Sequence, residues 1–132
     1  MIGFKQIEFF DHTPMTRRTL VLFDAGVEMV TGVALIAAPD VVSRLLLGVV
    51  LSGGGIAVAR VAGLGLLSLG VACWLGATGV TAQTIWALLT YNVLVTLYLG
   101  YLRIGGGFAG SLLWPVIVLH ALLTVLLGAT RE

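Results

Sequence analysis

The stretch TLVLFDAGVEMVTGVALIAA, residues 19–38, decides the fold of this chain. It is apolar except for two threonines, Asp24 and Glu28. About 20 residues of α-helix cross the ~30 Å hydrocarbon core of a bilayer, which matches the length of this stretch. Carboxylates at such depth are costly without partners. The stretch therefore predicts a transmembrane helix that turns its two acids toward a protein interior.

Three further apolar stretches of similar length follow, at residues 55–75, 84–102 and 112–128. Each carries one residue that hydrocarbon tolerates only with a partner: Arg60, Asn92 and His120, in that order. The connections between the last three stretches are short, which favours antiparallel neighbours. We therefore predict an all-α fold, an antiparallel bundle of four transmembrane helices that occupies residues 1–132 as a single membrane domain.

The segment 41–48 lies between the first two stretches and is too short to cross a bilayer. Pro39 and Asp40 precede it, and Asp40 is a suitable N-cap for a new helix. We expect a short interfacial helix here. At the N-terminal side, Thr13 and Pro14 form a typical helix start for the first span.

Composition excludes several classes of function. The chain is 59% hydrophobic and 10% charged, with a mean hydropathy of +1.11, whereas soluble domains are about 25% charged. A net charge of +1 gives no reason to invoke nucleic acid. The single cysteine, Cys73, excludes an internal disulfide and any Cys-x-x-Cys zinc or redox site. No metal site is expected, no hydrolase motif is present, and the chain is not expected to be an enzyme by itself.

The polar residues in the four stretches fall in one layer. Depth is counted from the end that holds the first and third connections, with about 1.5 Å of rise per residue. Glu28 and Asn92 then lie about 15 Å deep. His120 lies about 12 Å deep and Arg60 about 8 Å deep. Because unpaired charges are costly there, we expect these side chains to face inward, with a Glu28–Arg60 ion pair at the centre.

Asp24 lies one turn before Glu28 and shares its face. Two carboxylates at this spacing repel each other when both are ionised, so one is expected to be protonated unless an arginine compensates. Such a pair beside His120 could relay protons. The same cluster could instead serve only to fix the register of the helices, and the sequence leaves both interpretations open.

Aromatic residues near this layer suggest a ligand cavity between helices. The candidates are Tyr91, Tyr98 and Trp114, although aromatic side chains at helical spacing also fill ordinary cores. A quinone or a lipid is the ligand class that such a cavity would accept. Haem is not expected, because only His120 lies at depth and a second axial histidine would need a second subunit.

Small residues mark one face of the second stretch. Ala59 and Gly63 are four residues apart, and Gly70 follows at seven. Small residues at such spacings let two helix backbones approach closely. This face is expected to pack within the bundle, and a homodimer contact is the alternative.

The segment VEMVTGVALIAAP, residues 27–39, resembles the first helix of DoxX-like four-helix membrane proteins. The resemblance covers this helix and the four-span plan, and Glu28 is the residue that it carries over. It implies a part in a membrane quinol-oxidising or sulfur-oxidising system, or an accessory role beside redox-stress enzymes. Small multidrug transporters also have four helices and a glutamate in the first. Here Arg60 would partly neutralise Glu28, which argues against a free cation site, whereas Asp24 could restore one.

Three functions follow as hypotheses. The first is an accessory or structural subunit of a larger membrane complex, possibly a redox complex, with a protein partner or a second copy of the chain. The second is a small proton-coupled transporter in which Glu28 and Asp24 are the switching acids. The third is a membrane protein that binds a quinone or a lipid.

Basic residues give the expected orientation. One side holds Lys5, Arg17, Arg18 and Arg131, and the other holds Arg44 and Arg103, with Arg60 near that end of its helix. Cytoplasmic ends of membrane helices carry the excess of Lys and Arg. We therefore expect a multi-pass protein of the bacterial inner membrane with both termini in the cytoplasm.

Overall fold

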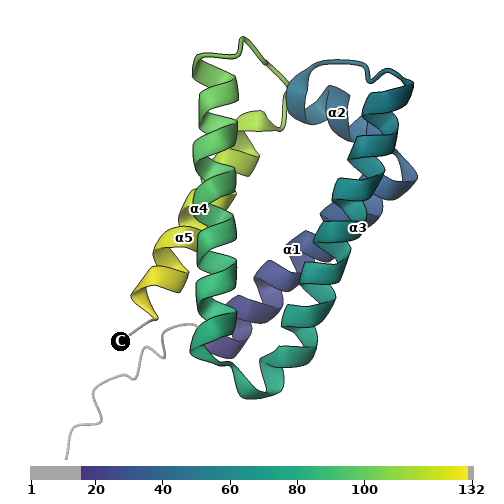
Figure 1. Cartoon of the computed structure of the whole chain (residues 1–132). Coiled ribbons are helices and arrows are strands. Elements are labelled where there is room, and N and C mark those ends of the chain that lie inside the picture. Colours follow the sequence, from purple (N-terminus) through teal and green to yellow (C-terminus); the bar gives the residue numbers. More distant parts are fainter. Residues whose placement is uncertain (1–15, 131–132) are drawn as a thin grey trace, which may run out of the picture.

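The computed structural model describes residues 16–130, which form helices and connecting turns and no strand (Figure 1). The helices are α1 (Arg17–Ala37), α2 (Pro39–Leu47), α3 (Gly53–Gly76), α4 (Ala82–Ile104) and α5 (Leu113–Ala129), with a 3-10 turn, η1 (Ala77–Gly79), after α3. The all-helical class predicted from the sequence is confirmed. The Thr13–Pro14 helix start and the charges of Lys5 and Arg131 lie outside the described residues.

Three of these helices are long and apolar enough to cross a membrane: α1, α3 and α4, with 21, 24 and 23 residues. The fourth apolar helix, α5, has 17 residues, or about 25 Å at the helical rise. All four helices begin and end within two residues of the predicted stretches. The chain therefore has the helices of a membrane protein, with one of them shorter than the other three.

Local sequence explains where the helices begin and end. The hydroxyl of Thr16 accepts a hydrogen bond from the Thr19 amide at the start of α1, and Thr81 does the same for α4. Such caps satisfy amides that have no partner inside the helix. Pro39 opens α2, and Gly48 ends it with a positive φ of 76°, which favours glycine. With nine residues, α2 is too short to span the bilayer.

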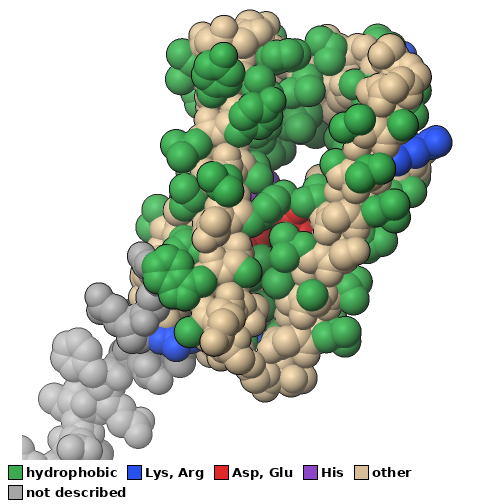
Figure 2. Space-filling model, in the orientation of Figure 1, with side chains coloured by type: hydrophobic (Ala, Val, Ile, Leu, Met, Phe, Trp, Pro, Cys, Tyr) green, Lys and Arg blue, Asp and Glu red, His purple; other side chains and the backbone are tan. Residues whose placement is uncertain are grey.

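The helices form two pairs, α1 with α3 and α4 with α5 (Figure 1). At the end of the molecule where α1 begins and α5 ends, the pairs share an apolar core that includes Leu20, Leu88 and Leu127. At the opposite end, the Leu112 amide donates to the Leu45 carbonyl oxygen at 2.8 Å, which joins the two connections. Between these ends the pairs separate, and Figure 2 shows an opening through the molecule with acidic atoms at its edge.

The α1–α3 pair is held by contact between backbones. A Cβ atom at Gly32 would lie 2.7 Å from the Gly63 carbonyl oxygen, and one at Gly63 would lie 2.7 Å from the Gly32 carbonyl oxygen. Gly70 approaches the Ala25 carbonyl oxygen in the same way. The glycine face of α3 is therefore occupied by α1 of the same chain, and Ala59 is half-buried one turn earlier.

Apolar side chains cover the outside of both pairs (Figure 2). The most exposed examples include Val30 on α1, Val58 on α3, Leu97 on α4 and Val125 on α5, each about two-thirds exposed or more. A water-soluble protein rarely exposes so much contiguous apolar surface. This surface fits contact with lipid chains.

Gly63→Ala tests the backbone contact. Overpacking a tight contact costs about 1–3 kcal/mol, so the melting temperature in mild detergent should fall, even though alanine is the better helix former by about 1 kcal/mol. Gly65→Ala is the matched control, because nothing lies within 4 Å of a Cβ atom there. Its melting temperature should stay the same or rise. Equal melting by circular dichroism for the two variants would contradict the observed α1–α3 contact.

Candidate functional site

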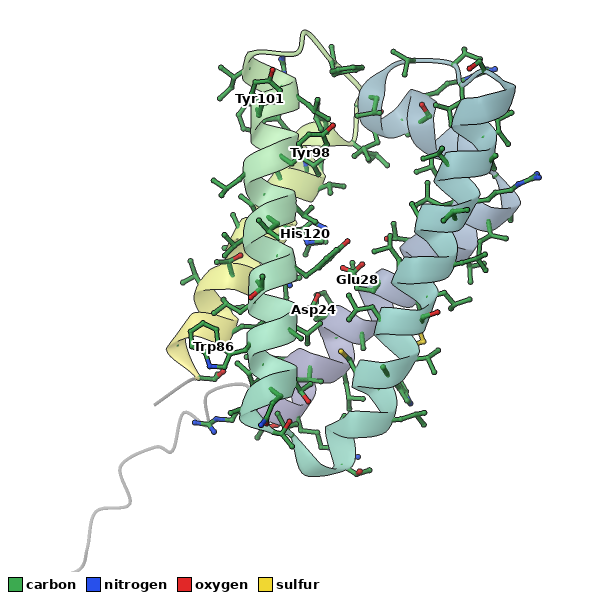
Figure 3. The ribbon with its side chains drawn as sticks, in the orientation of Figure 1. Asp24, Glu28, Trp86, Tyr98, Tyr101 and His120 are labelled. Atoms are coloured by element: carbon green, nitrogen blue, oxygen red, sulfur yellow. The ribbon has the colours of Figure 1, made fainter. Side chains whose placement is uncertain are left out.

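Two acids on α1 lie at the edge of the opening. Asp24 is fully buried and Glu28 is 1% exposed. They occupy the face of α1 that looks toward α4 and α5, because Ala25, Met29 and Gly32 on the other face pack against α3. Figure 3 shows both acids on the side of α1 where His120 of α5 also lies. The expected pairing of the two acids on one face is therefore present.

Asn92 of α4 links the two helix pairs. Its amide nitrogen donates to Asp24 Oδ2 at 2.8 Å and to the Leu88 carbonyl oxygen at 2.9 Å. Its amide oxygen lies 2.7 Å from Nδ1 of His120. The side chain thus uses both of its amide hydrogens and its oxygen in buried hydrogen bonds. It joins α1, α4 and α5 through a single chain that runs from Asp24 through Asn92 to His120.

This series of hydrogen bonds also determines which ring nitrogen of His120 carries a hydrogen. The Leu88 carbonyl can only accept, which places the nitrogen of the Asn92 amide on that side and its oxygen toward His120. The amide oxygen can only accept as well, so Nδ1 of His120 carries a hydrogen and donates it. In the neutral ring Nε2 then keeps its lone pair. No residue of the described chain hydrogen-bonds to that nitrogen.

Tyr91 completes the group from α4. Its phenol interacts with the carboxyl group of Glu28. Its ring meets the His120 ring edge-on, with centroids 5.9 Å apart and an interplanar angle of 77°. Tyr91 therefore lies between the acid of α1 and the imidazole of α5. It adds a hydroxyl and the face of an aromatic ring to the site.

Two carboxyl oxygens in this group lack a hydrogen bond. Oδ1 of Asp24 and Oε1 of Glu28 are both buried, and neither has a partner within residues 16–130. An unsatisfied buried oxygen costs about 1–3 kcal/mol, and more when it is charged. The site therefore has unused capacity to accept hydrogen bonds or to hold protons.

Arg60 does not join the cluster, and the expected ion pair with Glu28 is wrong. Arg60 is exposed on α3 and makes no contact with Glu28 within salt-bridge distance. The reason is the position of α3, which packs on the glycine-bearing face of α1 rather than on its acidic face. The long aliphatic stem of an arginine also lets its charge reach toward the membrane surface, so the residue needs no buried partner.

The three aromatic candidates separate into two groups. Tyr98 lies seven residues after Tyr91 and so shares its face of α4; it is 62% exposed and borders the space above His120 (Figure 3). Trp114 is 53% exposed, and the Arg103 guanidinium lies 5.9 Å from the centre of one of its rings. Trp114 is therefore an outward-facing residue near the beginning of α5 and not part of the cluster.

Gly32 is the contributor that the sequence analysis missed. It lies one turn after Glu28 on α1, and its missing side chain admits α3. The signal was available, because Ala25 and Gly32 are small residues seven positions apart, the same spacing as Gly63 and Gly70 on the partner helix. Close packing on this face leaves Asp24 and Glu28 to face the other pair.

The chemistry of the cluster follows from its charges. Neither acid forms an ion pair with a cation of the described chain, and no group of three His, Cys, Asp or Glu residues within it is arranged to hold a metal ion. A carboxylate without a countercharge is unfavourable at membrane depth. The two acids are therefore stable either with protons bound or with a cation supplied from outside the chain.

No protein-family model matches this chain, and no curated protein or solved structure is detectably similar to it. The resemblance of residues 27–39 to DoxX-like proteins remains a prediction.

Double-mutant cycles can test which residues couple. Asn92→Ala combined with His120→Ala should show a coupling free energy of about 0.5–2 kcal/mol in unfolding, because interhelical hydrogen bonds in membranes fall in this range. Glu28→Gln combined with Arg60→Ala should show none, since the two side chains do not meet. Strong coupling in the second cycle and none in the first, measured by unfolding in detergent, would support an ion pair that this structure lacks.

Proposed function

We propose that this chain is a small carrier of the bacterial inner membrane that exchanges protons for a cationic substrate at Asp24 and Glu28. The observation that supports this function is the pair of buried carboxyl groups with no countercation among the described residues. Because Arg60 is exposed on α3, it does not neutralise Glu28, and the two acids are free to bind a cation. The carrier hypothesis is therefore preferred to the accessory role.

Exchange follows from the cost of net charge inside the membrane. With protons on both acids the empty site is neutral. A bound cation stabilises a carboxylate and so favours release of one proton. When a proton binds to that carboxylate again, it displaces the cation. Binding of one excludes binding of the other, since both compensate the same charge. A proton gradient across the membrane could then drive movement of the cation in the opposite direction.

Other titratable groups surround the acids and contribute to any dependence on pH. Tyr91 of α4 and His120 of α5 face them from the second pair. Cys73 of α3 is buried behind them and close enough to interact with their charge. Neither the phenol nor the thiol supplies positive charge, and the imidazole donates its Nδ1 hydrogen to Asn92. The two carboxyl groups are the ones that a cation addresses directly.

The opening between the helix pairs supplies a route to the site. Acidic atoms lie at its edge (Figure 2), although Asp24 is fully buried and Glu28 is only 1% exposed. An amphipathic cation dissolved in the bilayer could enter sideways, with its charged group at Glu28 and its apolar part beside Tyr98. This geometry supports a lipid-soluble substrate better than a small hydrated ion.

The membrane arrangement belongs to the same proposal. In it, α5 serves as the fourth span and α2 lies at the membrane surface. Figure 1 draws the start of α1 and the end of α5 at one end of the molecule, which supports an even number of crossings. Arg17 and Arg18 are exposed at that end, and the positive-inside tendency would place it in the cytoplasm.

A second candidate is an accessory subunit of a larger membrane complex. The observation that favours it is the same opening, which a helix of a partner protein or of a second copy could fill. A neutral quinone or lipid is a third occupant, to which Tyr91 and His120 would offer hydrogen bonds. Neither explains the two uncompensated carboxyl groups, because none of these occupants must carry positive charge.

The proposed function is tested by counting protons released when a cation binds. The probe is octylammonium, titrated into detergent-solubilised protein by calorimetry in two buffers with different ionisation enthalpies. We expect release of about one proton per cation, and weaker binding as the pH falls, because protons compete for the same carboxyl groups. Glu28→Gln should abolish the release.

Arg60→Gln is the matched control, because it removes an exposed charge from the neighbouring helix. It should bind octylammonium and release protons as the wild type does. In liposomes with an imposed pH gradient, only the wild type and this control should accumulate the amine above the level of protein-free vesicles. Binding without proton release, or release that survives Glu28→Gln, would rule out the carrier.

A further inference from the structure

The polar atoms of the site that have no hydrogen-bond partner among the described residues can all accept hydrogen bonds. Oδ1 of Asp24 and Oε1 of Glu28 are buried without partners, and Nε2 of His120, in a side chain only 5% exposed, has no partner within the described chain. Figure 3 shows these three side chains around the same space. The ring of Tyr91 lies beside them and presents a surface that attracts cations.

We infer that the substrate is an alkylammonium ion that carries N–H groups, a primary or secondary amine with an apolar tail. This inference deepens the proposed function and depends on it. An ammonium group donates up to three hydrogen bonds, as a lysine side chain does, and stays protonated at neutral pH. A quaternary ammonium ion carries the same charge but donates none.

Asn92 is a positioning residue in this account. It is not expected to meet the substrate, because both of its amide hydrogens and its oxygen are engaged by Asp24, Leu88 and His120. Its amide oxygen holds the hydrogen of His120 on Nδ1 and so keeps Nε2 as an acceptor. If that bond were absent, the imidazole could place its hydrogen on Nε2 and present a donor to the cation. The amide thus determines whether the histidine attracts or repels an N–H group.

The apolar tail has a place in the same geometry. Apolar side chains border the opening (Figure 2), and Tyr98 lies along α4 from His120 and the acids (Figure 3). A chain of methylene groups gains free energy by leaving water for such surroundings. The ammonium group and the tail therefore select for one molecule that is cationic at one end and apolar at the other.

The test compares octylammonium with octyltrimethylammonium in the wild-type protein, by the calorimetric titration described above. A hydrogen bond to a charged group that cannot form typically costs about tenfold or more in affinity. We expect octylammonium to bind at least about tenfold more tightly, with proton release for both ions where binding is seen. This comparison needs no variant and so does not depend on folding of a mutant.

His120→Asn is the sharper variant. The shorter amide can keep a donor near the Nδ1 position for Asn92 while it removes the acceptor at Nε2. The preference for octylammonium should shrink by about tenfold, while octyltrimethylammonium should bind as before. Arg60→Gln should leave the preference unchanged.

The outcomes separate the two proposals. Equal affinity for both ions, each with proton release that Glu28→Gln abolishes, would overturn the choice of an N–H donor and leave the carrier standing. Tighter binding of octyltrimethylammonium would overturn it as well. Absence of binding and proton release with both ions would overturn the carrier and this inference together.

Discussion

Desolvation of the Asp24 and Glu28 carboxyl groups is the constraint on which the arrangement of the other helices depends. A helix that carries two acids into hydrocarbon is stable only if another helix covers them with polar groups. Asn92 meets this need for Asp24 with a bond of 2.8 Å and passes the contact on to His120. The phenol of Tyr91 interacts with the carboxyl group of Glu28, and one oxygen of that group has no partner among residues 16–130. The candidate site therefore consists of carboxyl oxygens whose hydrogen bonds the neighbouring helices only partly satisfy.

Much of the fold was predictable from composition and length alone. Apolar runs of about 20 residues separated by glycine, proline and polar turns gave each helix to within two residues. The close contact at Gly63 and Gly70 was also foreseeable, since small residues on one face have few other uses in a membrane helix. What composition could not supply was the pairing. Whether α1 packs most closely on α3 or on α4 depends on the surfaces of both partners. Here Gly32 lets the backbone of α1 contact the backbone of α3 at Gly63.

The sequence predicted how far along each helix the polar residues of the candidate site lie, but not toward which neighbour each side chain points. Helical rise placed Glu28, Asn92 and His120 in one layer correctly, because depth depends only on counting residues. The predicted ion pair of Arg60 was wrong because the direction of a side chain in the bundle depends on which neighbouring helix packs against its own helix. An arginine at moderate depth has a second solution, in which its stem lies along the helix and its charge approaches the surface. An aspartate or asparagine is too short for this, so the short polar residues were the reliable ones.

The glycine contact between α1 and α3 has a mechanical consequence. Helices whose backbones touch, as at Gly32 and Gly63, leave little room for side-chain rotations that would let them slide, so this pair is expected to move as a rigid body. The second pair is attached to it by an apolar core at one end and by the Leu112–Leu45 bond at the other. Any change in the width of the opening must then come from a rocking of one helix pair against the other. The hinge of that rocking would be the side chain of Asn92, which hydrogen-bonds to Asp24 of the first pair and to His120 of the second.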